Sequence, residues 1–236
     1  LIVHGDIRRM LLTQKALIEG GRALGLYAAT LVDTQHRSTD EAEVKRADSL
    51  VSFLTPIVKA MLTENANECT SLALQVYGGH GYIADNGMEQ YMRDARITTI
   101  YEGTTGIQAN DLLFRKMMRD QGATAKLFFA QVGETAQRLG ASPEPALQAM
   151  GLALGKALDA WLKASEWLAQ NVQSNLGGVL AGAVPYLNVA VAVCGAWQQG
   201  KAALISAAKL KAGEGDARFY QAKIATALFY AEHVLP

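Results

Sequence analysis

Residues 6–33 read DIRRMLLTQKALIEGGRALGLYAATLVD, and this pattern is typical of a long α-helix. Apolar residues recur every three or four positions, which places their side chains on one face of a helix. Gly20, Gly21 and Gly25 interrupt the segment, although a glycine inside a helix costs about 1 kcal/mol relative to alanine. We therefore expect this helix to pack tightly against a neighbour at its glycines. The apolar face consists mainly of Ile7, Met10, Leu11, Leu17, Leu24 and Leu31.

The same spacing continues along the chain of 236 residues, which contains only five prolines. A second long helix is predicted over residues 41–76, with Pro56 kinking it or starting a new turn, because proline removes a backbone hydrogen bond. The predicted fold class is all-α, an up-and-down helical bundle plus an additional helical extension, with almost no sheet. Further helices are predicted at 88–93, from Thr104 or Thr105 to about 120, and at 123–139, 144–171, 184–211 and 216–233.

The composition argues against two classes of partner. Lys plus Arg and Asp plus Glu both number 22, so the formal net charge is zero. There is no basic stripe of the kind that nucleic acid requires, and we expect neither a nucleic-acid nor a membrane partner. The most apolar stretch, residues 176–198, contains Pro185 and Asn188 and is predicted to be a buried core helix.

The two cysteines, Cys69 and Cys194, lie far apart in the sequence. Their spacing does not match a metal site, and four scattered histidines suggest none either. Both are predicted to be buried free thiols, which indicates a reducing compartment and a cytoplasmic location.

A glycine-rich segment, Gln75-Val76-Tyr77-Gly78-Gly79-His80-Gly81-Tyr82, directly follows the second predicted helix. Closely spaced glycines leave backbone amides accessible to an anionic or planar ligand. The alternative interpretation is a glycine-rich helix stop. The segment does not have the dinucleotide-binding pattern, because no strand precedes it. His80 is expected to be held by local hydrogen bonds or to contact a ligand.

A second unusual segment is Ile100-Tyr101-Glu102-Gly103-Thr104-Thr105-Gly106-Ile107-Gln108. Its lone carboxylate, Glu102, stands among apolar and small residues where an extended stretch, residues 97–101, is expected to meet a helix. Contact with an apolar ligand would make such a carboxylate a stronger base. The alternative is a carboxylate that stabilises a helix N-terminus. Arg93, Asp94 and Arg96 are predicted to form a structural ion-pair cluster, with phosphate binding as the alternative.

Together these segments resemble the acyl-CoA dehydrogenase family in order, spacing and content. The helices of residues 6–74 also resemble that family's C-terminal bundle. The long tail is similar to that of a larger subgroup, the 3-methylmercaptopropionyl-CoA dehydrogenase-like enzymes, which carry an extra helical extension. The matching stretches are residues 75–82, 93–96, 100–104 and 107–108.

The resemblance implies an FAD-dependent oxidoreductase of fatty acid metabolism that converts an acyl-CoA to the trans-2-enoyl-CoA. Glu102 matches the family's catalytic base, and Gly103 matches a position beside the substrate thioester. Many members have Gln where this chain has Gly106, so a contact there would be through the backbone. Cofactor contacts are implied for Thr104, Thr105 and Gly106 on the flavin nucleotide, and for Gln75, Val76, Tyr77, Gly78 and Gly79 on the FAD of a partner subunit.

The resemblance also implies partners and missing parts. We expect a homodimer or homotetramer and an electron acceptor such as an electron-transfer flavoprotein. The family's N-terminal helical domain, its β-domain and the first helix of its C-terminal bundle have no counterpart here. Residues 1–120 are therefore expected to be an incomplete bundle and residues 121–236 the extension, with the fragment inactive by itself. A non-catalytic helical assembly module and an acyl-CoA oxidase-like relative are the alternatives.

Overall fold

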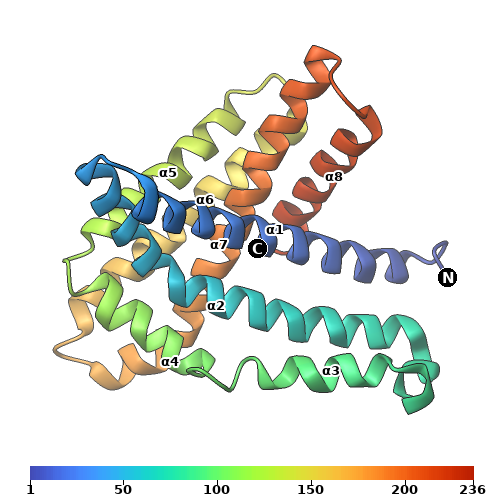
Figure 1. Ribbon diagram of the computed structural model, residues 1–236, viewed down its shortest axis with the longest axis horizontal. Coiled ribbons are helices and arrows are strands. Elements are labelled where there is room, and N and C mark those ends of the chain that lie inside the picture. Colours follow the sequence, from blue (N-terminus) through green and yellow to red (C-terminus); the bar gives the residue numbers. More distant parts are fainter.

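The computed structural model describes residues 1–236 and contains helices without any β-strand (Figure 1), so the all-α prediction is confirmed. Short connections join neighbouring helices. The long helices are α1 (Gly5–Arg37), α2 (Glu41–Tyr77), α5 (Ala123–Gly140), α6 (Pro145–Asn171), α7 (Leu176–Ala212) and α8 (Ala217–His233). The shorter elements are η1 (Gly78–Tyr82), η2 (Ala84–Asn86), α3 (Met88–Ile97), α4 (Thr105–Asn110) and η3 (Asp111–Met117), the last being π-helical.

Helices α1 and α2 form an antiparallel pair that crosses the molecule, and α3 and α4 follow along α2 (Figure 1). Asp40 caps α2, because its carboxylate accepts hydrogen bonds from the amides of Ala42 (2.8 Å) and Glu43 (3.4 Å). Pro56 is buried inside α2, which continues through it, so no new helix begins there. Helix α2 is thus one long support beneath the shorter elements that follow.

The glycines of α1 allow close packing, as predicted, and their neighbours belong to this same chain. A Cβ atom added to Gly20 would lie 3.5 Å from the Cα atom of Gly195 in α7. A Cβ atom on Gly21 would lie 3.2 Å from the side chain of Leu62 in α2. Gly25 is less tightly packed, with Leu62 at 3.9 Å. Residues near the start of the chain thus pack directly on its second half.

One continuous apolar core runs through both halves. At its centre is Trp161 of α6, which is fully buried. Its ring centroid lies 4.7 Å from that of Phe129 and 6.2 Å from that of Phe128, both in α5. Phe53 of α2 and Tyr186 of α7 complete the cluster, each at 6.4 Å. The predicted division of the chain into residues 1–120 and 121–236 stays a prediction. In the structure, buried apolar residues from both ranges belong to the same core.

Helix α7 begins earlier than the predicted residue 184. The Asn175 side chain caps it by accepting a hydrogen bond from the amide of Gly178 at 3.0 Å, so the two glycines expected to separate helices form its first turn. The helix is long and apolar enough to cross a membrane, but half of its most apolar window is buried in the protein. This agrees with the predicted core helix.

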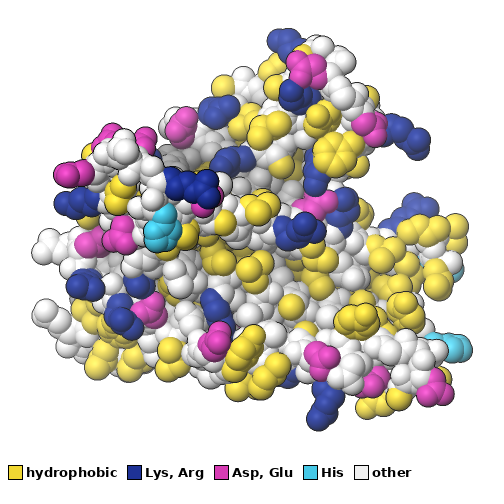
Figure 2. All heavy atoms as spheres, in the orientation of Figure 1, with side chains coloured by type: hydrophobic (Ala, Val, Ile, Leu, Met, Phe, Trp, Pro, Cys, Tyr) yellow, Lys and Arg dark blue, Asp and Glu magenta, His cyan; other side chains and the backbone are white.

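Both cysteines are buried free thiols, as predicted. Burial raises the pKa of Cys69 to about 11 and raises the pKa of Cys194 further. On the surface, positive and negative side chains are interspersed with apolar ones on the face shown in Figure 2. No single sign of charge dominates that face.

Candidate active site

Residues 97–101 form a tight turn rather than the expected extended segment. Ile97 is the last residue of α3, and its carbonyl accepts hydrogen bonds from the amides of Ile100 (2.9 Å) and Tyr101 (3.1 Å). β-branched residues favour extended backbone mainly when a neighbouring strand packs against them. This protein has no strand, and the turn satisfies the backbone groups locally.

Glu102 follows this turn in an unusual conformation. Its φ angle is +53°, in the left-handed region that residues with a side chain rarely adopt, and the residue is exposed. Such a conformation costs about 1–3 kcal/mol and persists only where neighbouring contacts hold it. Gly103 comes next, with φ +89°. The chain therefore reverses direction at the predicted base.

Thr104 caps the helix that follows, as predicted. Its hydroxyl oxygen accepts a hydrogen bond from the amide of Ile107 at 3.3 Å, and α4 begins at Thr105. The expected single helix to about residue 120 instead changes into the π-helical segment η3 at Asp111. Wider turns of this kind are rare and often accompany functional sites.

Helix α2 holds the Glu102 loop from beneath through Lys59. The ammonium group of Lys59 donates hydrogen bonds to the carbonyl of Thr98 (3.0 Å) and to the carbonyl of Gly103 (2.8 Å). One side chain thus binds both ends of the loop.

Two further contacts fix the start of α4. The Thr105 hydroxyl donates a hydrogen bond to the carboxylate of Glu64 in α2. The Thr105 amide donates to the carbonyl of Thr99 at 3.2 Å, and the Thr99 hydroxyl accepts from the guanidinium of Arg96. Because these bonds link α2, α3 and α4, the loop ends are positioned by three helices.

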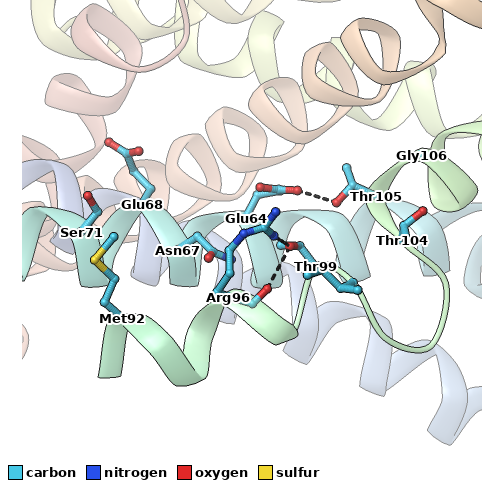
Figure 3. Close-up of a pocket in the computed structure, with 11 residues that line it drawn as sticks. Glu64, Asn67, Glu68, Ser71, Met92, Arg96, Thr99, Thr104, Thr105 and Gly106 are labelled. Atoms are coloured by element: carbon cyan, nitrogen blue, oxygen red, sulfur yellow. Dashed lines mark hydrogen bonds between the residues drawn. The ribbon is translucent and has the colours of Figure 1, made fainter. Parts of the chain in front are cut away.

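A polar groove of about 570 Å³ lies between α2 and the segment from α3 to α4. Figure 3 shows Glu64 and Glu68 on α2 facing this space, with Arg96 reaching toward Thr99 from α3. Hydroxyl, carboxylate, amide and guanidinium groups could therefore bind a polar ligand there. The groove is lined by Glu64, Asn67, Glu68, Ser71, Met92, Arg96, Thr99, Ile100, Thr104, Thr105 and Gly106.

The predicted cofactor residues Thr104, Thr105 and Gly106 line this groove. Glu102 and Gly103 do not line it, although they are adjacent in the sequence. The structure therefore places the two predicted roles, proton removal and cofactor binding, next to each other on one short segment. The roles themselves stay predictions.

The other predicted cofactor residues, Gln75, Val76, Tyr77, Gly78 and Gly79, lie at the far end of α2. Glu64, which contacts Thr105, precedes Gln75 by eleven residues, so the two points are separated by roughly 16 Å along the helix axis. All five are exposed except Val76, which is half-buried. Within one chain, the structure does not bring this segment to the groove.

The glycine-rich segment also ends α2, which agrees with the helix-stop interpretation. Gly78 has φ +61°, and its amide donates a hydrogen bond to the carbonyl of Gln75. A Cβ atom on Gly81 would lie 2.6 Å from the carbonyl oxygen of Leu74, so only glycine fits there. By contrast, nothing lies near the position of a Cβ atom on Gly78 or Gly79, which leaves space for a ligand.

The predicted ion-pair cluster of Arg93, Asp94 and Arg96 is wrong. Asp94 accepts a hydrogen bond from the side chain of Gln90 at 2.6 Å, and Arg96 donates to Thr99. Adjacent residues on a helix point in different directions, so Arg93 and Asp94 cannot face each other.

The polar residues of α2 that support the site were not predicted from the sequence. Lys59 contacts the loop, and Glu64 contacts α4. The side-chain amide of Asn67 donates a hydrogen bond to the carbonyl of Ala95 in α3 at 3.3 Å. A signal was present, because polar residues recur at three- and four-residue spacing through the middle of an otherwise apolar helix. Such a polar stripe on a packed helix indicates hydrogen bonds to a neighbouring segment.

Two family models match the chain. The first, described as acyl-CoA dehydrogenase, C-terminal domain, matches residues 1–117. The second, described as acetyl-CoA dehydrogenase C-terminal like, matches residues 128–236. The two matches together leave only a short linking stretch and include both unusual segments.

Curated relatives match over the full length of the chain. It is 43% identical over 235 residues to 3-methylmercaptopropionyl-CoA dehydrogenase of Ruegeria pomeroyi, covering 100% of this chain and 40% of that protein. It is 37% identical over 240 residues to the broad-specificity linear acyl-CoA dehydrogenase FadE5 of Mycobacterium tuberculosis, covering 99% and 39%. The chain thus spans about two fifths of the length of these relatives.

A solved structure shares the fold. The crystal structure of an acyl-CoA dehydrogenase complexed with FAD from Bacillus anthracis matches with a TM-score of 0.72 at 16% identity. The match covers 96% of this chain and 40% of that one. The helical arrangement described above is therefore one that a solved protein also adopts.

Proposed function

The chain belongs to the acyl-CoA dehydrogenase family, and we propose that it carries the base of an FAD-dependent enzyme that oxidises an acyl-CoA to the trans-2-enoyl-CoA. The observation that carries this proposal is the exposed Glu102 at positive φ, directly before Gly103, whose carbonyl accepts a hydrogen bond from Lys59 of α2. Strained residues cluster at functional sites. Gln121 shares the positive φ, but Glu102 in addition carries a carboxylate and stands next to the groove-lining Thr104.

The proposed reaction removes two hydrogens from neighbouring carbons. The Glu102 carboxylate takes the proton from the carbon next to the thioester carbonyl. FAD held by Thr104, Thr105 and Gly106 would supply the acceptor for the hydride from the next carbon. We propose that the thioester lies beside Gly103, where the Gln108 amide group stands 2.8 Å from the position of a Cβ atom, so a side chain larger than that of glycine would not fit. The backbone N–H of Glu102 is available to stabilise the developing negative charge on the thioester oxygen.

The residues of the groove fit a part of the cofactor. Hydroxyl and backbone groups of Thr104, Thr105 and Gly106 line an open polar space, although the Thr105 hydroxyl already donates to Glu64. Because Gly106 has no side chain, its contact would be through the backbone. We propose that these residues hold the flavin nucleotide.

The distant segment Gln75–Gly79 is proposed to bind the FAD of a second subunit. Its support is the open space at Gly78 and Gly79, together with the position of all five residues outside the lining of the groove, which along α2 extends to Ser71. This arrangement requires a homodimer or homotetramer. We also propose that the enzyme is cytoplasmic and passes its electrons to an electron-transfer flavoprotein.

The experiment that tests the proposal is stopped-flow bleaching of the flavin in the flavin-loaded enzyme. Glu102→Gln keeps the shape of the side chain and removes the base, so flavin reduction should slow by about 10²–10⁴-fold while acyl-CoA still binds. Glu134→Gln is a matched control, because it makes the same change at an exposed carboxylate in α5 that does not line the groove. A rate for Glu102→Gln within about threefold of the parent would assign the base elsewhere.

A further inference from the structure

Lys59 makes a contact that no other side chain of the site duplicates. Its ammonium donates to the carbonyls of Thr98 and Gly103, which lie on either side of the turn that carries Glu102. Gln108 also reaches the loop, where its side-chain amide donates to the carbonyls of Glu102 and Gly103, each at 3.5 Å, but it does not reach the carbonyl of Thr98. That distance is at the limit for a hydrogen bond, so the hydrogen bonds from Lys59 are stronger than those from Gln108.

These two hydrogen bonds also stabilise the partly buried charge of Lys59. The residue is half-buried in the middle of α2 and forms no ion pair. A charged group that leaves water needs hydrogen-bond partners, and hydrogen bonds to a charged donor are stronger than neutral ones. The loop carbonyls are the partners that satisfy this charge.

The positions of the two carbonyls connect Lys59 to the conformation of Glu102. The Gly103 carbonyl belongs to the residue that follows Glu102, so fixing it limits the rotation of the backbone between them. The backbone at Glu102 would relax to negative φ if nothing opposed it. The hydrogen bond from Lys59 to the Gly103 carbonyl opposes that relaxation. The hydrogen bond from the Ile107 amide to the Thr104 hydroxyl fixes the residue that follows Gly103.

We propose that Lys59 is a positioning residue for Glu102, which rests on the proposed role of Glu102 as the base. It holds the loop so that the carboxylate meets the substrate carbon in one orientation, and it does not itself touch the reacting atoms. A displacement of about 1 Å at a reacting group can slow a reaction 10²-fold. Loss of the Lys59 contact should therefore reduce the rate far more than it reduces substrate binding.

The test compares Lys59→Met with Lys59→Arg in the flavin-loaded enzyme. Methionine has a similar length and no donor, whereas arginine keeps donors for two carbonyls. Lys116→Met is the matched control, because Lys116 donates to Ser52 on the same helix at 2.9 Å, away from the loop. Three readouts are needed: hydrogen exchange of residues 98–106, the rate of flavin reduction, and the affinity for acyl-CoA.

We expect Lys59→Met to accelerate amide exchange in the loop by about tenfold or more and to slow flavin reduction by about 10- to 100-fold. Affinity for acyl-CoA should stay within about threefold, since Lys59 touches only the loop. Lys59→Arg should restore most of the rate, and Lys116→Met should change neither exchange nor rate. Should Lys59→Met not fold, Lys59→Gln, which is shorter and reaches the carbonyls poorly, serves in the same comparison.

The outcomes separate this inference from the proposed function. Unchanged loop exchange in Lys59→Met, or a loss of substrate affinity as large as the loss of rate, would overturn the positioning role. A full rate in Glu102→Gln would overturn the proposed function instead, and the exchange measurement does not depend on which residue is the base.

Discussion

The Glu102 loop and the layer of helices α5–α8 are held in place by different forces. The loop is exposed and is fixed by directional bonds from Lys59, Glu64 and Thr104. The helical layer is fixed mainly by buried apolar side chains around Trp161, and its side-chain hydrogen bonds, such as that from the Trp197 indole N–H to the Thr135 hydroxyl, are spread through the core rather than gathered on one segment. In this protein, the contacts that position chemical groups are thus separate from those that stabilise the fold.

Burial of apolar surface and hydrogen bonding have different effects on a structure. Burial of apolar surface is strong and non-directional, so it stabilises a core without fixing the angle of any one group. A hydrogen bond adds only about 1 kcal/mol to stability, but it fixes a distance and a direction. Substitutions in the helical layer should therefore act on stability, and substitutions in the loop should act on rate.

The largest expected change in stability is at Trp161. Trp161→Ala should lower the free energy of unfolding by about 3–5 kcal/mol, because it leaves a cavity among Phe53, Phe128 and Phe129. Urea unfolding followed by circular dichroism measures this change. Trp161→Phe keeps an aromatic ring and should cost clearly less; equal costs for the two variants would show that the ring contacts are not what holds the layer.

The next largest change is expected at Gly195, where α7 meets α1 and α8. A Cβ atom there would lie 2.1 Å from the hydroxyl oxygen of Tyr230 and 3.0 Å from Met61. Tyr230 is buried and cannot move freely, so Gly195→Ala should cost about 1–3 kcal/mol through overpacking. Gly155→Ala, at a position with open space, is the control and should be neutral or slightly stabilising. An unchanged melting temperature for Gly195→Ala would mean that α7 and α8 are packed loosely at Tyr230.

A smaller effect, of opposite sign, is expected in the loop. Glu102→Gly removes the strain of positive φ and should raise the free energy of unfolding by about 0.5–1 kcal/mol. In the flavin-loaded enzyme the same variant should lose the 10²–10⁴-fold contribution of the base. Gln121→Gly is a matched control, because Gln121 is the other residue with a side chain at positive φ. Gln121→Gly should gain similar stability and keep full activity. A loss of stability in Glu102→Gly would instead show that the Glu102 side chain contributes more to the fold than its backbone strain costs.

The smallest expected effect concerns the pH dependence of the link between α1 and α8. Burial opposes ionisation of Glu19, but hydrogen bonds from Lys15 and Lys223 outweigh it and lower the pKa of the carboxyl. A lowered pKa in the folded state adds stability above the unfolded value, and this stability is lost as pH falls through the folded pKa. Because the group is partly exposed, the contribution is about 0.5 kcal/mol. Glu19→Gln should therefore be less stable than the parent at pH 7, and the difference should disappear as the pH falls through the lowered pKa of the carboxyl; a difference that does not change with pH would contradict the ion-pair origin.

Much of the fold could be predicted from the sequence because it depends on local patterns. The apolar spacing predicted α1, α2, α5, α6 and α8 close to their observed bounds. The chemistry of short polar side chains predicted the cap at Thr104. The same reasoning failed at residues 97–101 and at the start of α7, since the intrinsic preferences of the residues were overridden by a turn and by the Asn175 cap.

Periodicity and residue type act over a few neighbouring positions, so the helical class, the glycine-rich end of α2 and the segment that contains Glu102 could be predicted from the sequence. Which side chain supports that segment depends on how the helices pack. Lys59 and Gly103 are far apart in the chain and meet because α2 packs beneath the loop. The same holds for Gly20 and Gly195, which bring the two halves into contact. Contacts of this kind depend on how whole helices pack, and no local pattern contains that information.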